Sequence, residues 1–322
     1  MRLSIVVPTY RRPELLARCL AALVHQDLDP AAFEVVIADD AAGESTRATV
    51  EGVALFARPV VRYVPVTGSH GPAAARNAGW RAARGEVIAF TDDDTVPDPD
   101  WAAAGLGAFE RDPALAAATG RTEVPIPPRP TDYERNESGL ATAEFVTANC
   151  FVRRAALEAV GGFDERFRAA WREDSDLHFA LLERGLKIVK VPSAVVVHPV
   201  RPAPWGVSVR MQRKSQYDAL LFKKHPELYR KRLPTGRPWD YYAIVAALLA
   251  GAGGVVGGSA AVALAAAAVW LALTGRFVAR RLRGNTLRPG HVAEMVVTSA
   301  VIPPLSVFWR LSGAAKFRAA FF

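Results

Sequence analysis

The feature that most limits how this chain can fold is a run of 34 residues, Tyr241 to Thr274, without a charged side chain. A helix needs only ~20 apolar residues to cross a bilayer. As one straight helix at ~1.5 Å per residue the run would be ~51 Å long, well over the ~30 Å hydrocarbon core. The glycine-rich sequence GAGGVVGG at 251–258 could turn the chain within it. We therefore expect a hairpin of two membrane helices over 241–274.

The net charge of +8 is unevenly distributed along the chain. Residues 1–200 contain 22 Lys and Arg against 28 Asp and Glu, a net charge of −6; residues 201–322 contain 18 against 4, a net charge of +14. Basic residues flank the uncharged run on both sides, and basic flanks stay cytoplasmic, so we expect both ends of the hairpin on that side. The split predicts a soluble domain over 1–200, a basic juxtamembrane segment over 201–240, and membrane-associated helices over 241–322.

A third apolar stretch, Met295–Trp309, contains Pro303 and Pro304, and the sequence is compatible with either a short span or an interfacial helix. No nucleic-acid-binding motif accompanies the basic residues, so the expected partner of this part is membrane lipid and not nucleic acid. These features predict a protein of the cell inner membrane whose soluble domain lies in the cytoplasm.

Residues 1–200 show short apolar runs that alternate with segments of helical spacing. The expected buried strands are Leu3–Val7, Phe33–Ala38, Val60–Val64, Gly85–Phe90 and Ile188–Val197. Helices are expected over Pro13–His25 and around Pro72–Arg84. Such alternation predicts an α/β fold with a doubly wound sheet, and the ligands of such sheets bind at the carboxyl ends of the strands.

Two of these strands end in consecutive carboxylates, Asp39–Asp40 and Asp92–Asp94. Three adjacent negative charges repel one another unless positive charge is brought to them. Mg²⁺ and Mn²⁺ take hard oxygen ligands and keep open positions for phosphate, so we predict one of them as a cofactor. The alternative is a solvated turn, since Asp and Pro are common turn residues.

Five motifs follow one another along this part of the chain: VVPTYRR, VVIADD, GPAAARNAGWRAARGEVIAFTDDDTVP, GGFDERF and WREDSDL. Together they resemble the glycosyltransferases of family 2, inverting nucleotide-sugar enzymes with the GT-A fold. The resemblance covers about residues 3–200; residues 201–322 share only the tendency of such enzymes to carry membrane segments. It implies a Rossmann-like doubly wound mixed sheet followed by a helical, membrane-associated region.

The resemblance also implies roles for single residues. It assigns Asp94 to the metal, with Asp92 and His198 as further ligands, although a lone histidine at a strand end can be merely structural. Asp40 holds the usual position for a carboxylate that accepts from the imide-type N–H of a nucleotide base; its alternative is a helix N-cap. The full expected donor site is Pro8, Thr9, Tyr10, Arg12, Asp39, Asp40, Arg76, Asn77, Asp92 and Asp93.

Arg76 and Asn77 have more than one possible role. The Arg76 guanidinium can reach the diphosphate or brace the acidic cluster, because it fits phosphate and carboxylate groups bidentately. Asn77 can fix a loop by hydrogen bonds. The alternative is that both are ordinary residues of a helix surface.

The reaction needs a base, because an acceptor hydroxyl loses its proton as it attacks the anomeric carbon. By resemblance the base is Asp174, the second acid of the Glu-Asp pair in WREDSDL, and Glu173 is a neighbour that shapes its position or pKa. Acids in a first helical turn are also stabilised by the helix dipole, so ordinary capping is the alternative.

We therefore predict a membrane-anchored inverting glycosyltransferase that moves a sugar from a nucleotide-diphosphate donor to a hydroxyl of a glycan or lipid-linked acceptor. One alternative is a polyprenyl-phosphate glycosyltransferase that makes a lipid-linked sugar monophosphate. Another is a non-catalytic, membrane-anchored binding protein, which loss of the acidic cluster or the Glu-Asp pair would favour; both are present. No Gly-x-Gly-x-x-Gly sequence follows the first strand, which argues against a dinucleotide-binding enzyme.

Overall fold

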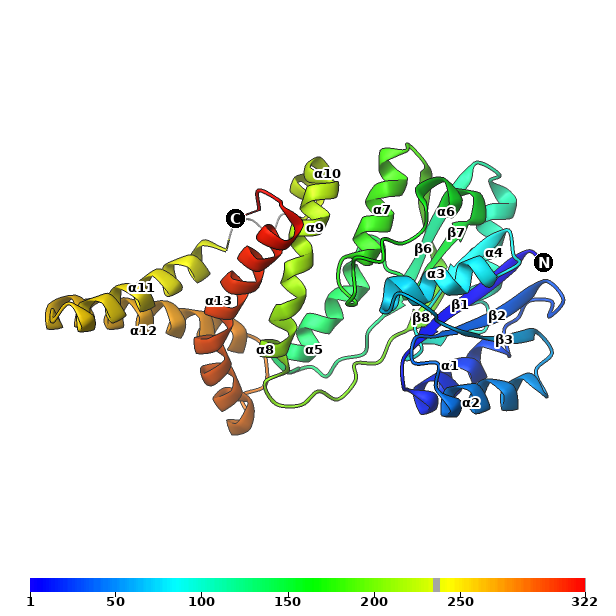
Figure 1. The fold of residues 1–322 in the computed structure, drawn as a ribbon. Helices are drawn as coiled ribbons and strands as arrows, with labels where there is room; N and C mark the ends of the chain where they lie inside the picture. The colour runs from blue at the N-terminus through cyan, green and yellow to red at the C-terminus, as the bar shows by residue number, and fades with distance from the viewer. Residues whose placement is uncertain (234–237, 322) are drawn as a thin grey trace. The chain divides into compact units, whose positions relative to one another are not determined.

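The computed structural model describes residues 1–233 and 238–321 (Figure 1). Residues 234–237 of the expected basic segment, which include Arg237, lie outside this description. The chain forms two compact units. The first comprises Met1–Pro125 and Ser138–Val200, and the second comprises Ile126–Glu137 and Arg201–Phe322.

The first unit is built on a mixed sheet. Its strands are β1 (Leu3–Thr9), β2 (Phe33–Asp39), β3 (Val60–Pro65), β4 (Val87–Phe90), β5 (Val96–Pro97), β6 (Leu115–Glu123), β7 (Cys150–Arg153) and β8 (Lys187–Val197), in the spatial order β3-β2-β1-β4-β7-β6-β8-β5. Strands β3, β2, β1 and β4 are parallel, β7 is antiparallel to both of its neighbours, and β8 is parallel to β6. The expected doubly wound sheet is confirmed.

Helices cover both faces of this sheet (Figure 1). They are α1 (Pro13–Leu23), α2 (Glu44–Ala54), α3 (Pro72–Ala82), α4 (Trp101–Arg111), α6 (Arg154–Val160), α7 (Glu173–Glu183) and the 3-10 helix η1 (Ser138–Thr142). Neighbouring residues of a strand point to opposite faces. Ile5 accordingly packs with residues of α1 and α4, whereas Val6 packs with residues of α3, α6 and α7. Gly79 brings α3 close to β1, since a Cβ atom there would lie 2.3 Å from Val6 Cγ1.

The register of the parallel strands sets where the functional residues lie. Thr9 at the end of β1 pairs with Asp39 at the end of β2, and β4 pairs with β1 only as far as Val6 opposite Phe90. The residues that follow β4 therefore run beside the last residues of β1. The two acidic sequences predicted to share one sheet edge do share it.

The second unit is helical, as expected. Its helices are α5 (Asp132–Glu137), α8 (Val207–Met211), the 3-10 helix η2 (Gln212–Ser215), α9 (Gln216–Lys224), α10 (Pro226–Arg232), α11 (Trp239–Val256), α12 (Ala260–Leu282) and α13 (Pro289–Phe317). By length and composition, α11, α12 and α13 could each cross a membrane. The uncharged run forms two helices, α11 and most of α12, which approach closely because Gly254 has no side chain: a Cβ atom there would lie 2.7 Å from Ala263 N. Helix α13 continues through Pro303 and Pro304.

A buried arginine joins residues 126–137 to the rest of the second unit. Arg281 donates through Nη2 to Asp132 at 2.6 Å and through Nη1 to Thr298 Oγ1 at 2.6 Å. The Arg135 side chain donates a second hydrogen bond between the same segments, from its Nε atom to Asn285 Oδ1. From the sequence we expected residues 126–137 to belong to the soluble domain, whereas these contacts group them with the helical unit.

Candidate active site

The turn after β4 carries the three consecutive carboxylates, Asp92–Asp94. Thr95 closes this turn, because its Oγ1 atom donates to the Asp92 carbonyl oxygen at 2.7 Å. Thr91 fixes its buried side by donating to the Ala148 carbonyl oxygen at 2.9 Å. The three side chains are therefore held in defined directions at the carboxyl edge of the sheet.

The middle carboxylate, Asp93, is turned into the protein. It is buried and accepts hydrogen bonds from Thr9 Oγ1 at 2.8 Å and from Arg12 Nη1 at 3.1 Å. Burial raises the pKa of Asp93, while the Arg12 charge and the Thr9 bond act in the opposite direction. Thr9, Arg12 and Asp93, all expected at the donor, thus form one bonded group that supports the turn.

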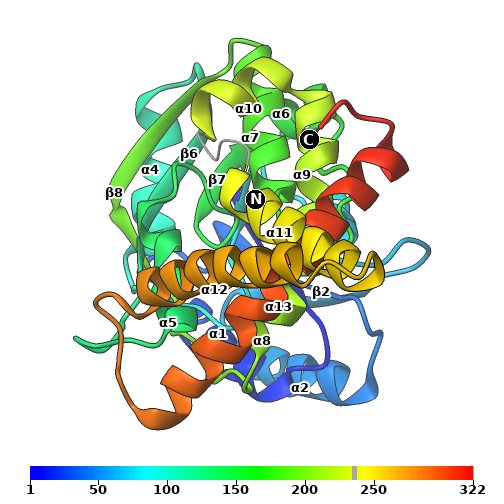
Figure 2. The ribbon, with the colours of Figure 1, turned by 90° about the vertical axis from the view of Figure 1, so that its left-hand side faces the viewer.

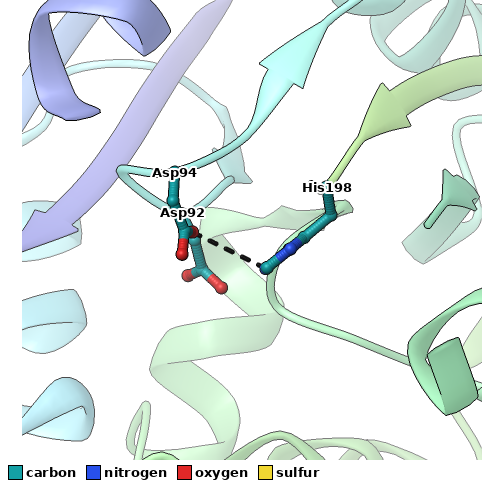
Figure 3. Close-up of side chains that lie close together, drawn as sticks. All are labelled: Asp92, Asp94 and His198. Atoms are coloured by element: carbon teal, nitrogen blue, oxygen red, sulfur yellow. Dashed lines mark ion pairs between the residues drawn. The ribbon is translucent and has the colours of Figure 1, made fainter. Parts of the chain in front are cut away.

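The outer carboxylates meet His198 (Figure 3). Potential ligand atoms of Asp92, Asp94 and His198 all lie within 4.8 Å of one another, and His198 Nε2 is 3.6 Å from Asp94 Oδ1. His198 reaches this place because it follows β8 and its N–H donates to the Glu123 carbonyl oxygen of β6 at 2.7 Å. Two carboxylates and one imidazole, converging on one point at the sheet edge, form a donor set that fits a divalent cation.

A buried arginine connects this cluster with the acids of α7. Arg76 of α3 donates through Nη2 to Asp92 Oδ1 at 2.8 Å and through Nη1 to Glu173 Oε1 at 3.0 Å. The Arg76 Nε atom and the Glu173 Oε2 atom are both buried and have no hydrogen-bond partner among the described residues. Of the two roles weighed for Arg76, these contacts are those of a brace on the acidic cluster.

Glu173 and Asp174 begin α7, where acidic side chains are favoured by the helix dipole. Asp174 accepts from the N–H of Ser175 at 2.6 Å. Burial raises the pKa of Glu173 and of Asp174, while Arg76 acts in the opposite direction on both. The preceding residue, Arg172, has a φ of 76°, a left-handed conformation that is uncommon outside glycine. The chain thus turns sharply just before the two acids.

Asp39 and Asp40, at the end of β2, have separate sets of partners. Asp39 is buried and accepts from the N–H groups of Ala41 and Gly43 and from Tyr63 Oη at 3.0 Å. Asp40 accepts from His70 Nδ1 and from the Gly71 N–H, both at 3.0 Å. Asp39 therefore stabilises the loop after β2, and Asp40 stands nearer to solvent beside an exposed imidazole.

The remaining expected donor residues are more dispersed. Pro8 is buried within β1, and Tyr10 is half exposed just beyond it. Asn77 bonds to both main-chain polar groups of Phe163, at 2.9 Å and 3.0 Å, and donates to Glu165 at 2.8 Å. Asn77 therefore fixes the loop after α6, which was one of its two weighed roles.

His70 is the main polar neighbour of the site that we did not single out from the sequence. It lies directly before the motif GPAAARN, and that adjacency was its only signal. Its bond to Asp40 brings an imidazole next to the carboxylate expected to meet the base.

Known protein families match this chain over most of its length. The model of "Glycosyl transferase family 2" matches residues 4–161, and that of "Glycosyl transferase family group 2" matches residues 87–311. The chain is 31% identical to the pre-mycofactocin glycosyltransferase of Mycobacterium tuberculosis over 67% of its length and 46% of the relative. It is 24% identical to the validoxylamine A glucosyltransferase of Streptomyces hygroscopicus over 75% of its length and 59% of the relative. The chain thus spans about half the length of these curated relatives.

Solved structures share the fold. A mannosyltransferase from Pyrobaculum calidifontis, in complex with GDP-Man and Mn²⁺, aligns with 98% of this chain and 87% of its own at a TM-score of 0.61 and 24% identity. Residues 1–349 of TarS from S. aureus, in complex with UDP-GlcNAc, align with 97% of this chain and 92% of their own at a TM-score of 0.53 and 18% identity. The expected GT-A-like fold is confirmed.

Proposed function

Because the chain belongs to the family 2 glycosyl transferases, we propose that it is a membrane-anchored inverting enzyme that transfers a sugar from a nucleotide-diphosphate donor to an acceptor hydroxyl. One observation carries the proposal. Arg76 bonds to Asp92 in the carboxylate–histidine cluster and to Glu173 beside Asp174. A site for a cation and a candidate base are thereby joined through a single buried guanidinium.

The donor half of the proposed site is the cluster of Asp92, Asp94 and His198. These residues would hold a divalent cation, which supplies positive charge for a diphosphate leaving group. The P. calidifontis mannosyltransferase, which shares the fold, was solved with GDP-Man and Mn²⁺, and this supports a metal of that kind. Asp40, with His70 beside it, is the candidate contact for the nucleotide base.

The acceptor half of the proposed site is the start of α7. Asp174 is the candidate base, and burial raises its pKa, which makes its carboxylate a stronger proton acceptor than an ordinary aspartate. Glu173 does not need to touch substrate, because its bond to Arg76 holds the first turn of α7 in place.

The presence of a candidate base also bears on the acceptor. A hydroxyl must lose its proton as it attacks, whereas a polyprenyl-phosphate oxygen is already ionised and needs no base. The Glu-Asp pair therefore favours a hydroxyl of a glycan or of a lipid-linked sugar over a lipid phosphate. We propose that the helical unit keeps the enzyme near such an acceptor at the cytoplasmic face of the inner membrane.

Nucleotide and metal binding test the donor half of the proposal. Thermal unfolding of the full chain in detergent would be followed with GDP, UDP and their sugar conjugates, each with and without Mn²⁺. We expect one nucleotide to stabilise the protein only when Mn²⁺ is present, by about 2.7 kcal/mol at a ligand concentration of ~100 Kd. The variant Asp94→Asn should lose this stabilisation while unfolding at a similar temperature without ligand. Nucleotide stabilisation that is equal without metal would contradict the proposed cluster.

A further inference from the structure

Helix α13 is long and apolar enough to cross a membrane, yet we infer that it lies along the lipid surface and that only α11 and α12 cross the bilayer. The sequence left both placements open for this segment. The inference rests on the proposed membrane anchoring and adds a lipid-contact surface and a topology to it.

One face of α13 is already covered by protein. Its buried residues recur every three or four positions, which places them on one side of the helix: Met295, Thr298, Ser299, Ile302, Pro303 and Val307. Helix α9, η2 and α8 pack against α13, as do the hairpin helices α11 and α12. A third of its most apolar window, 33%, is buried inside the protein, against 17% for α11 and for α12.

Polar partners accompany α13 along its whole length. Near its start, Glu294 accepts from the Gly206 N–H at 2.7 Å, at the head of α8. Further along, the Arg213 guanidinium of η2 lies 5.7 Å from the centre of the Trp309 ring. Near its end, Lys316 Nζ donates to Gln216 Oε1 at 3.1 Å.

These partners could not follow α13 into a bilayer without cost. If α13 crossed, η2 would enter the hydrocarbon with it, including the Arg213 guanidinium beside the Trp309 ring. Charged side chains are rare at that depth because their desolvation is expensive. Gly313 holds α9 close, since a Cβ atom there would lie 2.4 Å from the Gln216 carbonyl oxygen. The close packing leaves α9 little freedom to move away.

The other face of α13 is apolar and exposed. It carries Val297, Val301, Phe308 and Leu311, which are between 39% and 58% exposed. Their spacings of four, seven and three residues place them in one stripe. An apolar stripe bordered by basic helices is the pattern of a helix that lies in the interface of an anionic bilayer. The neighbouring segment, residues 201–239, contains ten Lys and Arg.

The direction of α13 agrees with this placement. In Figures 1 and 2, α13 crosses the direction of the α11–α12 hairpin and does not run beside it. If the hairpin spans the bilayer, α13 is therefore inclined towards the plane of the membrane. We identify the partner of its exposed stripe as the lipid headgroup region, with anionic lipids favoured by the basic surroundings.

Cysteine labelling from the two sides of the membrane tests the topology. Single substitutions Val256→Cys, Leu287→Cys and Ala320→Cys would be placed in the full chain, at the hairpin turn, before α13 and after α13. The native Cys19 and Cys150 are fully buried, so the unsubstituted chain should show little labelling. An impermeant maleimide would be applied to right-side-out and inverted vesicles.

We expect Leu287→Cys and Ala320→Cys to be labelled severalfold better in inverted vesicles, and Val256→Cys to show the opposite preference. Labelling of Leu287→Cys and Ala320→Cys from opposite sides would overturn the interfacial placement of α13 and leave the anchor standing. Labelling of all three positions from one side would instead remove the membrane-crossing hairpin, and with it the proposed anchoring.

Depth measurements test the lipid contact itself. A fluorophore would be attached to Val301→Cys or Phe308→Cys, with the exposed Leu271→Cys in the middle of α12 as the matched control. Nitroxide groups placed shallow or deep in phosphatidylglycerol-containing vesicles would quench it. We expect stronger quenching by the shallow nitroxide at both α13 positions and by the deep nitroxide at the control. Deep quenching at Val301→Cys, or no quenching at either α13 position, would overturn the inference.

Discussion

The two units of this protein each bury an arginine that is bonded to a carboxylate, and they use it differently. The Arg76 side chain in the first unit is 4% exposed and bonds to Asp92 and Glu173. The Arg281 side chain in the second is 7% exposed and bonds to Asp132, with hydroxyl groups as its other partners. Removing one partner of such an ion pair lowers the stability of the folded protein, because the other partner is left without its countercharge.

The two arginine clusters differ in whether their buried polar atoms all have hydrogen-bond partners. All three nitrogens of the Arg281 guanidinium donate to protein oxygens. In the first unit, Arg76 Nε and Glu173 Oε2 have no partner among residues 1–233 and 238–321. A saturated network only holds elements together, whereas polar capacity left unused inside a cluster of carboxylates is typical of a site that awaits a ligand.

The largest contrast should come from matched aspartate-to-asparagine changes in the two units. Asp174→Asn removes the proposed base with almost no change in volume, and we expect turnover to fall by about 10²–10⁴-fold. The melting temperature should not fall, because burial already disfavours the charged form of this carboxyl. Steady-state kinetics and thermal unfolding measure the two effects.

Asp132→Asn serves as the control in the helical unit. It takes the charge from the Arg281 pair, so we expect a lower melting temperature with kcat per folded molecule unchanged. If the turnover of Asp174→Asn stayed within a few-fold of the parent, Asp174 would not be the base. The expected contrast between the two variants would then also be wrong.

Replacing the arginines themselves sharpens the comparison. Arg76→Met leaves the buried Glu173 carboxylate without its partner, and Arg281→Met does the same to the Asp132 carboxylate, which is 24% exposed. We expect the first change to lower the free energy of unfolding by about 3–5 kcal/mol and the second to lower it by less. Only Arg76→Met should also raise the Mn²⁺ concentration needed for half-maximal activity, because Arg76 orients Asp92. Titrations of activity with Mn²⁺ separate the two variants. An equal shift in both would mean that stability alone explains the effect.

Within the first unit, we expect activity and stability to change with pH in opposite directions. Burial raises the pKa of Asp174, so its basic form is lost, and activity falls, at a pH above the ordinary aspartate pKa of about 3.9. The raised pKa of Glu173 acts on stability with the opposite sign. Its contribution is full below the ordinary glutamate pKa and is lost as the pH rises through the raised value.

Profiles of kcat/KM and of melting temperature against pH test this opposition. Glu173→Gln should flatten part of the stability profile, since it removes one of the carboxyls whose pKa is raised by burial. An acid limb of activity at the pH of an ordinary aspartate would contradict the burial of the proposed base.

The smallest expected effect lies at the exposed pair of His70 and Asp40. Pairs of this kind contribute ~0.2–1 kcal/mol, so His70→Ala should raise the donor KM by no more than ~5-fold and leave kcat unchanged. Donor titrations with the preferred sugar nucleotide measure it. A large fall in kcat would mean that His70 acts in the reaction and not only beside the base.

Local sequence patterns predicted much of the first unit. Strands β1 and β2 are buried at every position, and their sequences are apolar up to Val7 and Ala38 except at Ser4 and Glu34, so both strands could be predicted. Helix α2 was missed, because only Thr46 and Val50 of its eleven residues are buried and its apolar spacing is weak. Strand β5 has two residues and is defined only by its pairing with β8.

Contacts between distant residues explain what the sequence could not supply. The order of Asp92, Asp93 and Asp94 does not say which carboxylate turns inward. That depends on Thr9 and Arg12, which are more than 80 residues away. Asp132 and Arg281 are separated by 149 residues, and nothing in the sequence around either residue indicates that they pair. The roles of single acids therefore came from the resemblance to a family and not from spacing.

The grouping of residues 126–137 with the helical unit has a practical consequence for protein engineering. No single cut releases a free-standing sheet unit, because a fragment that stops at residue 200 retains Asp132 and Arg135 but loses Arg281 and Asn285. A chimaera that swaps the helical part between two related enzymes must exchange both stretches together. Otherwise residues 126–137 of one enzyme would be combined with the helical part of the other, without the native partners of Asp132 and Arg135.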